Sequence, residues 1–160
     1  MSEFIPFMVK SLPILAGLFL TLITGAAARE EISGPVAAHI LRVIDGDTLL
    51  VEAEPWPQQK IEVYVRIRGI DAPELRSKCL AIRHAGLNAR QALEALTSGS
   101  RKIQLTRIAG DKYFGRIVAD VMLPDGVNAA DRLLLAGLVT GYDGGRKPRE
   151  VCGTASLGDH

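Results

Sequence analysis

The sequence is 160 residues long, with 48% hydrophobic and 23% charged residues and only 2 Cys. This composition excludes collagen, mucin and a wholly disordered chain, and two cysteines are too few for a disulfide scaffold or a structural zinc site. The net charge of +1 excludes a strongly basic protein that coats nucleic acid. Any contact with a polyanion must therefore come from locally placed cations. A chain of this length fits one domain.

The first apolar segment of the chain is typical of an export signal. Residues 11–28 carry no charge, follow Lys10 and end in three alanines of the kind that a signal peptidase reads. We therefore expect cleavage after Ala28 and a secreted or periplasmic protein. The alternative is a membrane anchor through residues 11–28, because eighteen apolar residues are near the lower limit for a membrane span. A start at Met8 would give a more typical signal, so we hypothesise that translation begins there.

The periodicity of the remaining chain predicts five strands and two helices in the order β-β-β-α-β-β-α. The strands are expected at residues 38–44, 48–53, 61–68, 102–108 and 117–123, and the helices at 80–96 and 129–136. The strand at 61–68 is the clearest, because apolar and polar residues alternate over eight positions. This order is that of a five-stranded OB-fold barrel, a mainly β, α+β architecture. We place this domain at residues 36–145 and a C-terminal tail at 146–160.

Both predicted helices have recognisable faces or ends. The first helix places apolar residues at spacings of three and four on one face: Ile82, Ala85, Ala89, Leu93 and Leu96. The second helix is expected to be capped by Asn128, with Asp131 in its first turn and Gly137 at its end.

The two cysteines, Cys79 and Cys152, lie in the part of the chain that is predicted to be exported. In an oxidising compartment we expect a single disulfide between them, which would tie the glycine-rich tail to the domain. The alternative is a pair of unrelated thiols.

Two acidic groups lie at the ends of predicted strands. Asp45 and Asp47 flank a glycine, and Asp71 and Glu74 follow the strand at 61–68. Each group alone is typical of a turn, because Asp-Gly and Asp-Ala-Pro sequences favour turns. Together they suggest that acidic residues from two neighbouring strands meet at one rim of the barrel.

This acidic rim is a candidate metal site. The carboxylates of Asp47 and Asp71 would repel each other there unless a cation joined them. A set of oxygen ligands without His or Cys suits a hard ion such as Ca²⁺, and the main-chain carbonyl of Ala72 and water could complete its coordination.

Arginines accompany the acidic groups. Arg66 and Arg68 lie two residues apart, so they share the face of their strand that points away from the core. Arg116 follows a short loop later in the chain. Arginine binds phosphate through a planar fork, although a solvated cationic face is the alternative, above all for Arg68. Carboxylates that hold a metal beside two arginines and a spare Glu74 are typical of phosphoryl transfer. No nucleotide-binding loop is present in the sequence, which favours a phosphodiester substrate.

Four segments resemble the staphylococcal nuclease (thermonuclease) family in this order. They are Asp45-Gly-Asp47-Thr48, Arg66-x-Arg68-Gly-Ile-Asp71-Ala-Pro-Glu74, Lys112-Tyr113-Phe114-Gly115-Arg116 and Gly137-Leu138. The resemblance covers about residues 38–143. It implies an OB-fold barrel with helices. It also implies an enzyme that hydrolyses DNA and RNA with Ca²⁺, cuts the P–O5′ bond and leaves 3′-phosphates.

The resemblance further implies roles for single residues. It places Asp47, Asp71 and the Ala72 carbonyl at the calcium ion, Glu74 as the general base, and Arg66 and Arg116 at the phosphate. It places Lys112 and Tyr113 near the terminal phosphate of the nucleotide and Tyr142 against a base. Two local departures stand out: Phe114 is extra relative to the commonest Lys-Tyr-Gly-Arg form, and Tyr142 is the single tyrosine where the best-known member has two.

We therefore predict an exported, monomeric, Ca²⁺-dependent nuclease, a phosphodiester hydrolase of the endo- or exonuclease type. DNA and RNA are the expected partners, and single strands are expected to bind most easily because OB-folds favour them. Contact with a membrane is expected only if the N-terminal segment is retained. The alternative is a non-catalytic nucleic-acid-binding OB module, which would need neither a base nor paired arginines.

Overall fold

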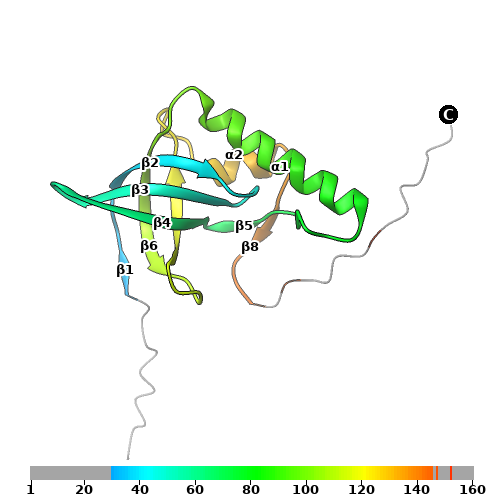
Figure 1. Ribbon diagram of the computed structural model, residues 1–160, viewed down its shortest axis with the longest axis horizontal. Coiled ribbons are helices and arrows are strands. Elements are labelled where there is room, and N and C mark those ends of the chain that lie inside the picture. Colours follow the sequence, from blue (N-terminus) through cyan, green and yellow to red (C-terminus); the bar gives the residue numbers. More distant parts are fainter. Residues whose placement is uncertain (1–29, 146, 148–151, 153–160) are drawn as a thin grey trace, which may run out of the picture.

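The structure is a computed structural model that describes residues 30–145, 147 and 152. The predicted export signal lies outside the described residues. Within the described part, five strands close into a barrel, and two helices lie against one side of it (Figure 1). The five-stranded barrel with two helices that the sequence predicts is therefore confirmed. No helix in the described part is long and apolar enough to cross a bilayer.

Each strand of the barrel bonds to two neighbours. In spatial order the strands are β2 (Val36–Val43), β3 (Thr48–Trp56), β4 (Gln59–Ile67), β7 (Arg116–Met122) and β6 (Lys102–Gly110). All pairings are antiparallel except that of β4 with β7, and the pairing of β6 with β2 closes the barrel. The predicted strands are present with ends shifted by a few residues.

Three short strands were not predicted, because two or three residues are too few to show a periodic pattern. Strand β1 (Glu31–Ile32) pairs antiparallel with β6, while β5 (Gly69–Asp71) and β8 (Thr140–Tyr142) form a separate two-stranded sheet. The β5–β8 sheet links the end of β4 to the C-terminal part of the described chain.

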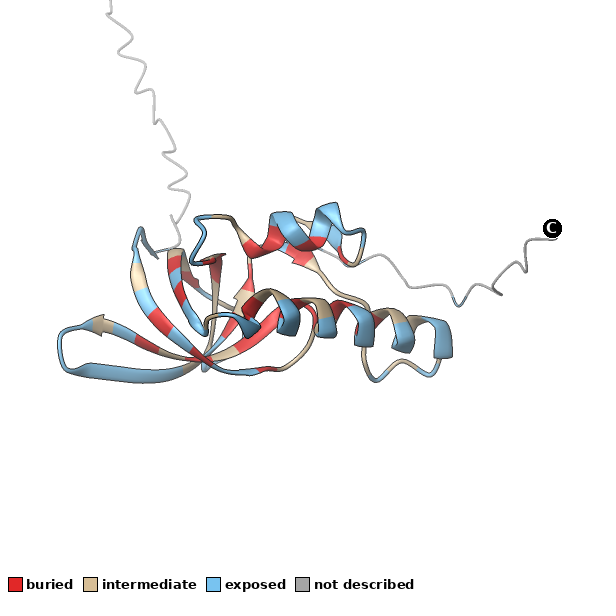
Figure 2. Ribbon diagram, turned by 90° about the horizontal axis from the view of Figure 1, so that it is seen from above, coloured by how far each residue is buried: buried red, intermediate tan, exposed pale blue. Residues whose placement is uncertain are grey.

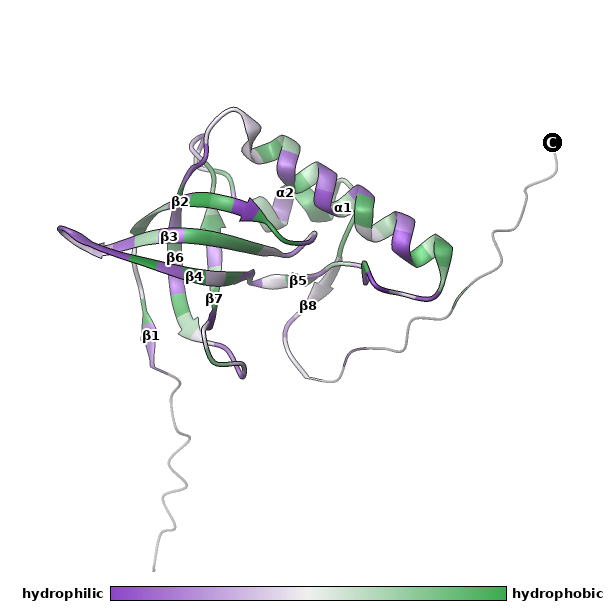
Figure 3. Cartoon of the chain, in the orientation of Figure 1, coloured by the Kyte–Doolittle hydropathy of each residue, from purple (hydrophilic) through white to green (hydrophobic). Residues whose placement is uncertain are grey.

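One core fills the barrel and extends beneath the helices (Figure 2). Val65 and Ile67 are fully buried in β4, while Arg66 between them points to the other face, as the alternating pattern predicts. Helix α1 (Leu80–Ser98) buries Ala89 and Leu93 of its predicted apolar face. Hydrophobic and hydrophilic positions alternate along α1 in Figure 3, which is the pattern of a helix with one face on the core.

Helix α2 (Ala129–Leu135) begins and ends where the sequence predicts, within one residue. The side-chain oxygen of Asn128 accepts a hydrogen bond from the Ala130 N–H at 2.9 Å, which satisfies one of the free amides of the first turn. This short helix contacts α1, β5 and β7, so it supports the small β5–β8 sheet from one side.

A disulfide joins Cys79, the residue before α1, to Cys152 in the C-terminal segment. The two Cα atoms are 5.6 Å apart, although the residues are 73 positions apart in the sequence. The bridge therefore fixes one point of the C-terminal segment to the start of α1.

Reduction of this disulfide is expected to lower the melting temperature both with and without Ca²⁺. A bridge that closes a loop of this length stabilises a small domain by about 2–5 kcal/mol, through restriction of the unfolded chain. Thermal unfolding followed by circular dichroism, with and without a reductant, measures the effect. Two titratable thiols in the oxidised, unfolded protein would contradict the bridge.

Candidate active site

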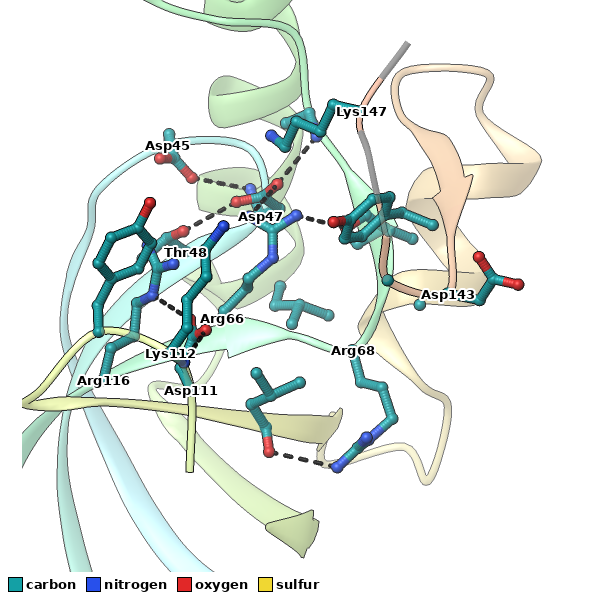
Figure 4. A pocket seen from close by; sticks show the side chains of 18 of the residues that line it. Asp45, Asp47, Thr48, Arg66, Arg68, Asp111, Lys112, Arg116, Asp143 and Lys147 are labelled. Carbon is teal, nitrogen blue, oxygen red and sulfur yellow. Dashed lines mark hydrogen bonds and ion pairs between the residues drawn. The ribbon is translucent and has the colours of Figure 1, made fainter. Parts of the chain in front are cut away.

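A pocket of about 740 Å³ opens where the turn after β2, the β4–β5 segment, the β6–β7 loop and the segment after β8 meet (Figure 4). Its lining brings together most of the predicted site residues: Asp47, Arg66, Ala72, Glu74, Lys112, Tyr113, Arg116 and Tyr142. Asp71 is not part of the lining, but it contacts two lining residues, Arg66 and Lys147. The predicted residues therefore gather at one place in the fold.

Asp47 is buried, and two hydrogen bonds from neighbouring residues hold its carboxylate. Its Oδ1 accepts a hydrogen bond from the Thr48 hydroxyl at 2.8 Å, and its Oδ2 accepts one from the Ala72 N–H at 2.9 Å. Gly46 allows this approach, because a Cβ at that position would lie 2.8 Å from the Cβ of Ala72 and 2.6 Å from that of Ala89. The close packing fixes the Asp47 carboxylate at the edge of the pocket, and the contact recorded for Ala72 is made by its amide.

Asp45 lies beside Asp47, and its Oδ1 accepts a hydrogen bond from the Asp47 N–H at 3.0 Å. Burial and the negative charge of Asp47 raise the pKa of Asp45 to about 6. Asp45 was not predicted to have a role of its own. Its position two residues before Asp47 in a tight turn was the available signal.

Arg66 joins Asp47 and Asp71, the two carboxylates that were predicted to meet. Its Nη1 lies 3.2 Å from Asp47 Oδ2, and its Nη2 donates to Asp71 Oδ1 at 2.8 Å. Gly69, with φ of +84°, bends the chain between β4 and β5, and this bend returns Asp71 to the guanidinium. The cation expected to offset the repulsion between Asp47 and Asp71 is, among the described residues, the Arg66 guanidinium, which bridges the two acids.

Arg66 remains positively charged at any physiological pH. Burial lowers its pKa, but the carboxylates of Asp47 and Asp71 outweigh burial and hold the pKa above its ordinary value. The Arg66 side chain is only 14% exposed and is oriented by both acids. It is thus a preorganised cation at the base of the pocket.

The β6–β7 loop supplies a second arginine. Arg116 Nε forms an ion pair with Asp111, and the guanidinium lies 4.6 Å from the centroid of the Tyr113 ring. Lys112 Nζ lies 5.0 Å from the same ring. Phe114 is fully exposed and lies outside the pocket lining, so the extra residue leaves Lys112, Tyr113 and Arg116 in the lining.

Asp111 was not predicted as a site residue. It holds Arg116 as Asp47 and Asp71 hold Arg66, through a side-chain ion pair. The only signal in the sequence was an acidic residue five positions before the arginine, across a loop. Its contribution is to orient the second phosphate-binding candidate.

Glu74 is an exposed carboxylate in the pocket lining. Its Oε1 accepts a hydrogen bond from the Arg76 N–H at 3.3 Å, and it forms no ion pair with any residue that the structure describes. Unlike Asp47 and Asp71, it is therefore available to a water molecule or a substrate.

The segment after β8 completes the pocket. The Tyr142 ring lies 5.4 Å from the Arg66 guanidinium carbon, and its hydroxyl donates to the Gly145 carbonyl at 2.8 Å. Lys147 Nζ forms an ion pair with Asp71 Oδ1. No sequence pattern singled out Lys147, because its approach depends on how the chain returns to the barrel.

Arg68 has a different environment from Arg66. Its Nη2 contacts Glu31 at 3.3 Å, and its Nε lies 3.8 Å from Asp120, which also binds Arg107. Arg68 lines one side of the pocket, but its charge is committed to this network. It is therefore a paired structural arginine rather than a simply solvated one.

The residues at the pocket provide oxygen ligands for a hard cation. Across the described ranges, no three His, Cys, Asp or Glu side chains converge in a geometry that would hold a metal ion. Two carboxylates, Asp47 and Asp71, nevertheless meet within reach of one guanidinium, with Asp45 and Glu74 nearby. This chemistry fits Ca²⁺ better than a softer metal, because the set contains neither sulfur nor imidazole.

Comparison with known proteins agrees with this site. Two proteins named as uncharacterized endonucleases, from Escherichia coli and Escherichia coli O157:H7, are 29% and 28% identical to this chain over 108 residues. The matched region covers 68% of this chain and 62% of each relative, so the chain spans less than two thirds of their length. The model of the family described as "Staphylococcal nuclease homologue" matches residues 64–151. Because that match covers more than half of the chain, the chain belongs to the staphylococcal nuclease homologue family.

Proposed function

We propose that this protein is an exported, Ca²⁺-dependent nuclease that hydrolyses phosphodiester bonds of DNA or RNA and leaves 3′-phosphates. One observation carries the proposal: Arg66 and Arg116 line the same pocket as the carboxylate of Glu74, which forms an ion pair with none of the described residues. A phosphate bound between the arginines would therefore lie beside a group able to accept a proton. The two endonuclease names among the relatives support the same chemistry.

Under this proposal, different residues of the pocket activate the water, bind the phosphate and hold the metal ion. Glu74 orients the attacking water and accepts its proton. Arg66 and Arg116 bind the phosphoryl oxygens and stabilise the charge that develops on them, which is the dominant contribution in reactions of this type. Asp47 and Asp71 would hold the Ca²⁺ ion. When bound, this ion supplies positive charge next to the phosphoryl oxygens.

The preferred substrate under this proposal is a flexible single strand, bound by a monomer. Tyr113 and Tyr142 give aromatic surface at the pocket, and aromatic stacking is tolerant of sequence. Lys112 adds a cation near the path of the strand. Ring stacking and local cations together suit a nuclease with little sequence preference.

Two features of the chain support export. The Cys79–Cys152 disulfide supports an oxidising compartment, where such bonds persist. Residues 11–28 supply the signal under this proposal, with retention as a membrane anchor as the alternative.

A cleavage assay tests the proposed activity. Purified protein is incubated with labelled single-stranded DNA, duplex DNA and RNA, with Ca²⁺ or with a chelator. Cleavage that requires Ca²⁺ and gives products carrying 3′-phosphates is expected. Tight binding without cleavage in any divalent cation would instead establish the non-catalytic module.

Ca²⁺ is expected to raise the melting temperature of the wild type, and Asp47→Asn is expected to abolish the rise. A ligand that binds only the folded protein stabilises it by about 2.7 kcal/mol at a hundred times Kd. The variant also removes the ion pair between Arg66 and Asp47, so that Asp71 is the one carboxylate of the two that still pairs with Arg66. The stability of the variant without metal should therefore fall. Differential scanning fluorimetry over a Ca²⁺ series measures both effects.

Asp125→Asn is a matched control for this experiment, because Asp125 is an exposed aspartate that pairs with Arg132 away from the pocket. It should retain the full Ca²⁺-dependent rise. A wild-type melting temperature that does not respond to Ca²⁺, together with full activity in chelator, would contradict the metal site.

A further inference from the structure

We propose that Lys147 binds a phosphate of the substrate strand and that the Cys79–Cys152 disulfide holds it at the pocket for that purpose. The inference rests on the proposed function, and it adds a binding residue from a segment outside the barrel. It concerns the strand that enters the site rather than the chemistry of the cleaved bond.

The contact of Lys147 with Asp71 is the first observation. The Oδ1 atom of Asp71 accepts from Arg66 Nη2 at 2.8 Å and also forms the ion pair with Lys147 Nζ. The Lys147 side chain is 52% exposed, whereas that of Arg66 is 14% exposed. Asp71 thus orients two cations, one fixed inside the site and one at its mouth.

The position of Lys147 in the pocket is the second observation. Figure 4 shows it on the other side of Asp47 from Arg116, beyond the end of β8. It is part of the lining together with Lys112 and both candidate phosphate-binding arginines. A strand with one phosphate at Arg66 and Arg116 must place neighbouring phosphates on either side, and Lys147 is a cation on the side away from Arg116.

The ion pair with Asp71 does not by itself explain why Lys147 lies at the pocket. A half-exposed pair contributes little to stability, about 0–1 kcal/mol, because water screens it. The Lys147 ammonium group has three N–H donors and remains in contact with solvent. It can therefore donate a hydrogen bond to a phosphate oxygen while it stays near Asp71. A polyanion that replaces solvent there gains a charge-assisted contact.

The disulfide explains how a residue beyond the barrel stays at the pocket. Cys152 follows Lys147 by five positions and is bonded to Cys79, directly before α1. Helix α1 in turn packs through Ala89 against Gly46, in the turn that carries Asp47. The bond therefore anchors the chain, five residues after Lys147, to the same framework that positions the acidic residues.

The salt dependence of strand binding tests the phosphate contact. Binding of a single-stranded oligonucleotide is measured by fluorescence anisotropy over a salt series, in the Glu74→Gln background so that the strand is not cut. Each phosphate contact on a single strand contributes ~0.7 to the slope of log K against log salt. Lys147→Gln is expected to reduce the slope by ~0.7, and Lys147→Arg is expected to retain it.

Lys60→Gln is the matched control, because Lys60 is an exposed lysine paired with Glu52 on the β3–β4 hairpin. Its slope should equal that of the parent. A slope that is unchanged in Lys147→Gln would overturn the phosphate contact. An equal reduction in Lys60→Gln would overturn it as well, since the effect would then reflect total charge.

The role of the disulfide is tested by a cycle with the Cys79→Ser/Cys152→Ser variant, at a temperature where all variants remain folded by circular dichroism. This variant should lose the same part of the slope, and addition of Lys147→Gln should cause no further loss. Two additive losses would overturn the tether. The proposed function fails separately, if wild-type protein binds the strand with the expected slope but never cuts it.

Discussion

Glu74→Gln is expected to lower kcat by about 10²–10⁴ while strand binding remains. Glutamine keeps the size of the side chain and its hydrogen-bonding ability but cannot accept the proton of the attacking water. Glu74 is free for this role, because among the described residues its side chain accepts a single hydrogen bond, from the Arg76 N–H at 3.3 Å. Initial rates on a labelled single strand, with anisotropy for binding, separate the two effects.

Glu94→Gln is the matched control. It makes the same chemical change at an exposed glutamate that pairs with Arg90 on α1. Both variants should melt near the wild-type temperature, and only Glu74→Gln should lose activity. Near-normal turnover by Glu74→Gln would make Glu74 an ordinary loop residue and would remove the general base from the mechanism.

The fold could be predicted wherever the sequence had a clear period. The alternation at 61–68 identified β4, and the spacing of Ala89 and Leu93 identified the buried face of α1. The β5–β8 sheet could not be predicted in this way, because each of its strands has three residues and its pairing joins distant segments. That small sheet nevertheless decides where Asp71 and Tyr142 lie.

The sequence allowed us to predict which residues form the site but not which of them contact one another. Asp47, Asp71 and Arg66 stood out because acids and arginines recur at strand ends, yet the sequence contained no sign that Arg66 would bridge the two acids. The bridge depends on the positive φ of Gly69, which turns the chain from β4 into β5 and so toward Asp71. Asp111 and Lys147 were missed for the same reason, since each acts through a partner that only the folded chain brings near.

Arg116→Lys is expected to lower kcat by about 10²–10³, the usual cost of one lost donor to the charge of the transition state. Lysine keeps the positive charge but loses the planar fork that binds two phosphoryl oxygens. Arg116 has Asp111 as its one ion-pair partner in the described structure, so the melting temperature should change little. Steady-state kinetics and thermal unfolding of the same samples give both numbers.

Arg66→Lys should lower kcat to a similar extent and should also reduce stability. Its guanidinium bridges Asp47 and Asp71, and a single ammonium cannot keep both contacts in the same geometry. The partly buried acids would then repel each other, so Ca²⁺ should restore more stability to this variant than to Arg116→Lys. Arg132→Lys, at the exposed pair with Asp125, should change neither quantity. If Arg66→Lys lost stability but kept its kcat, Arg66 would be a structural bridge, and Arg116 with Lys112 would remain to bind the phosphate.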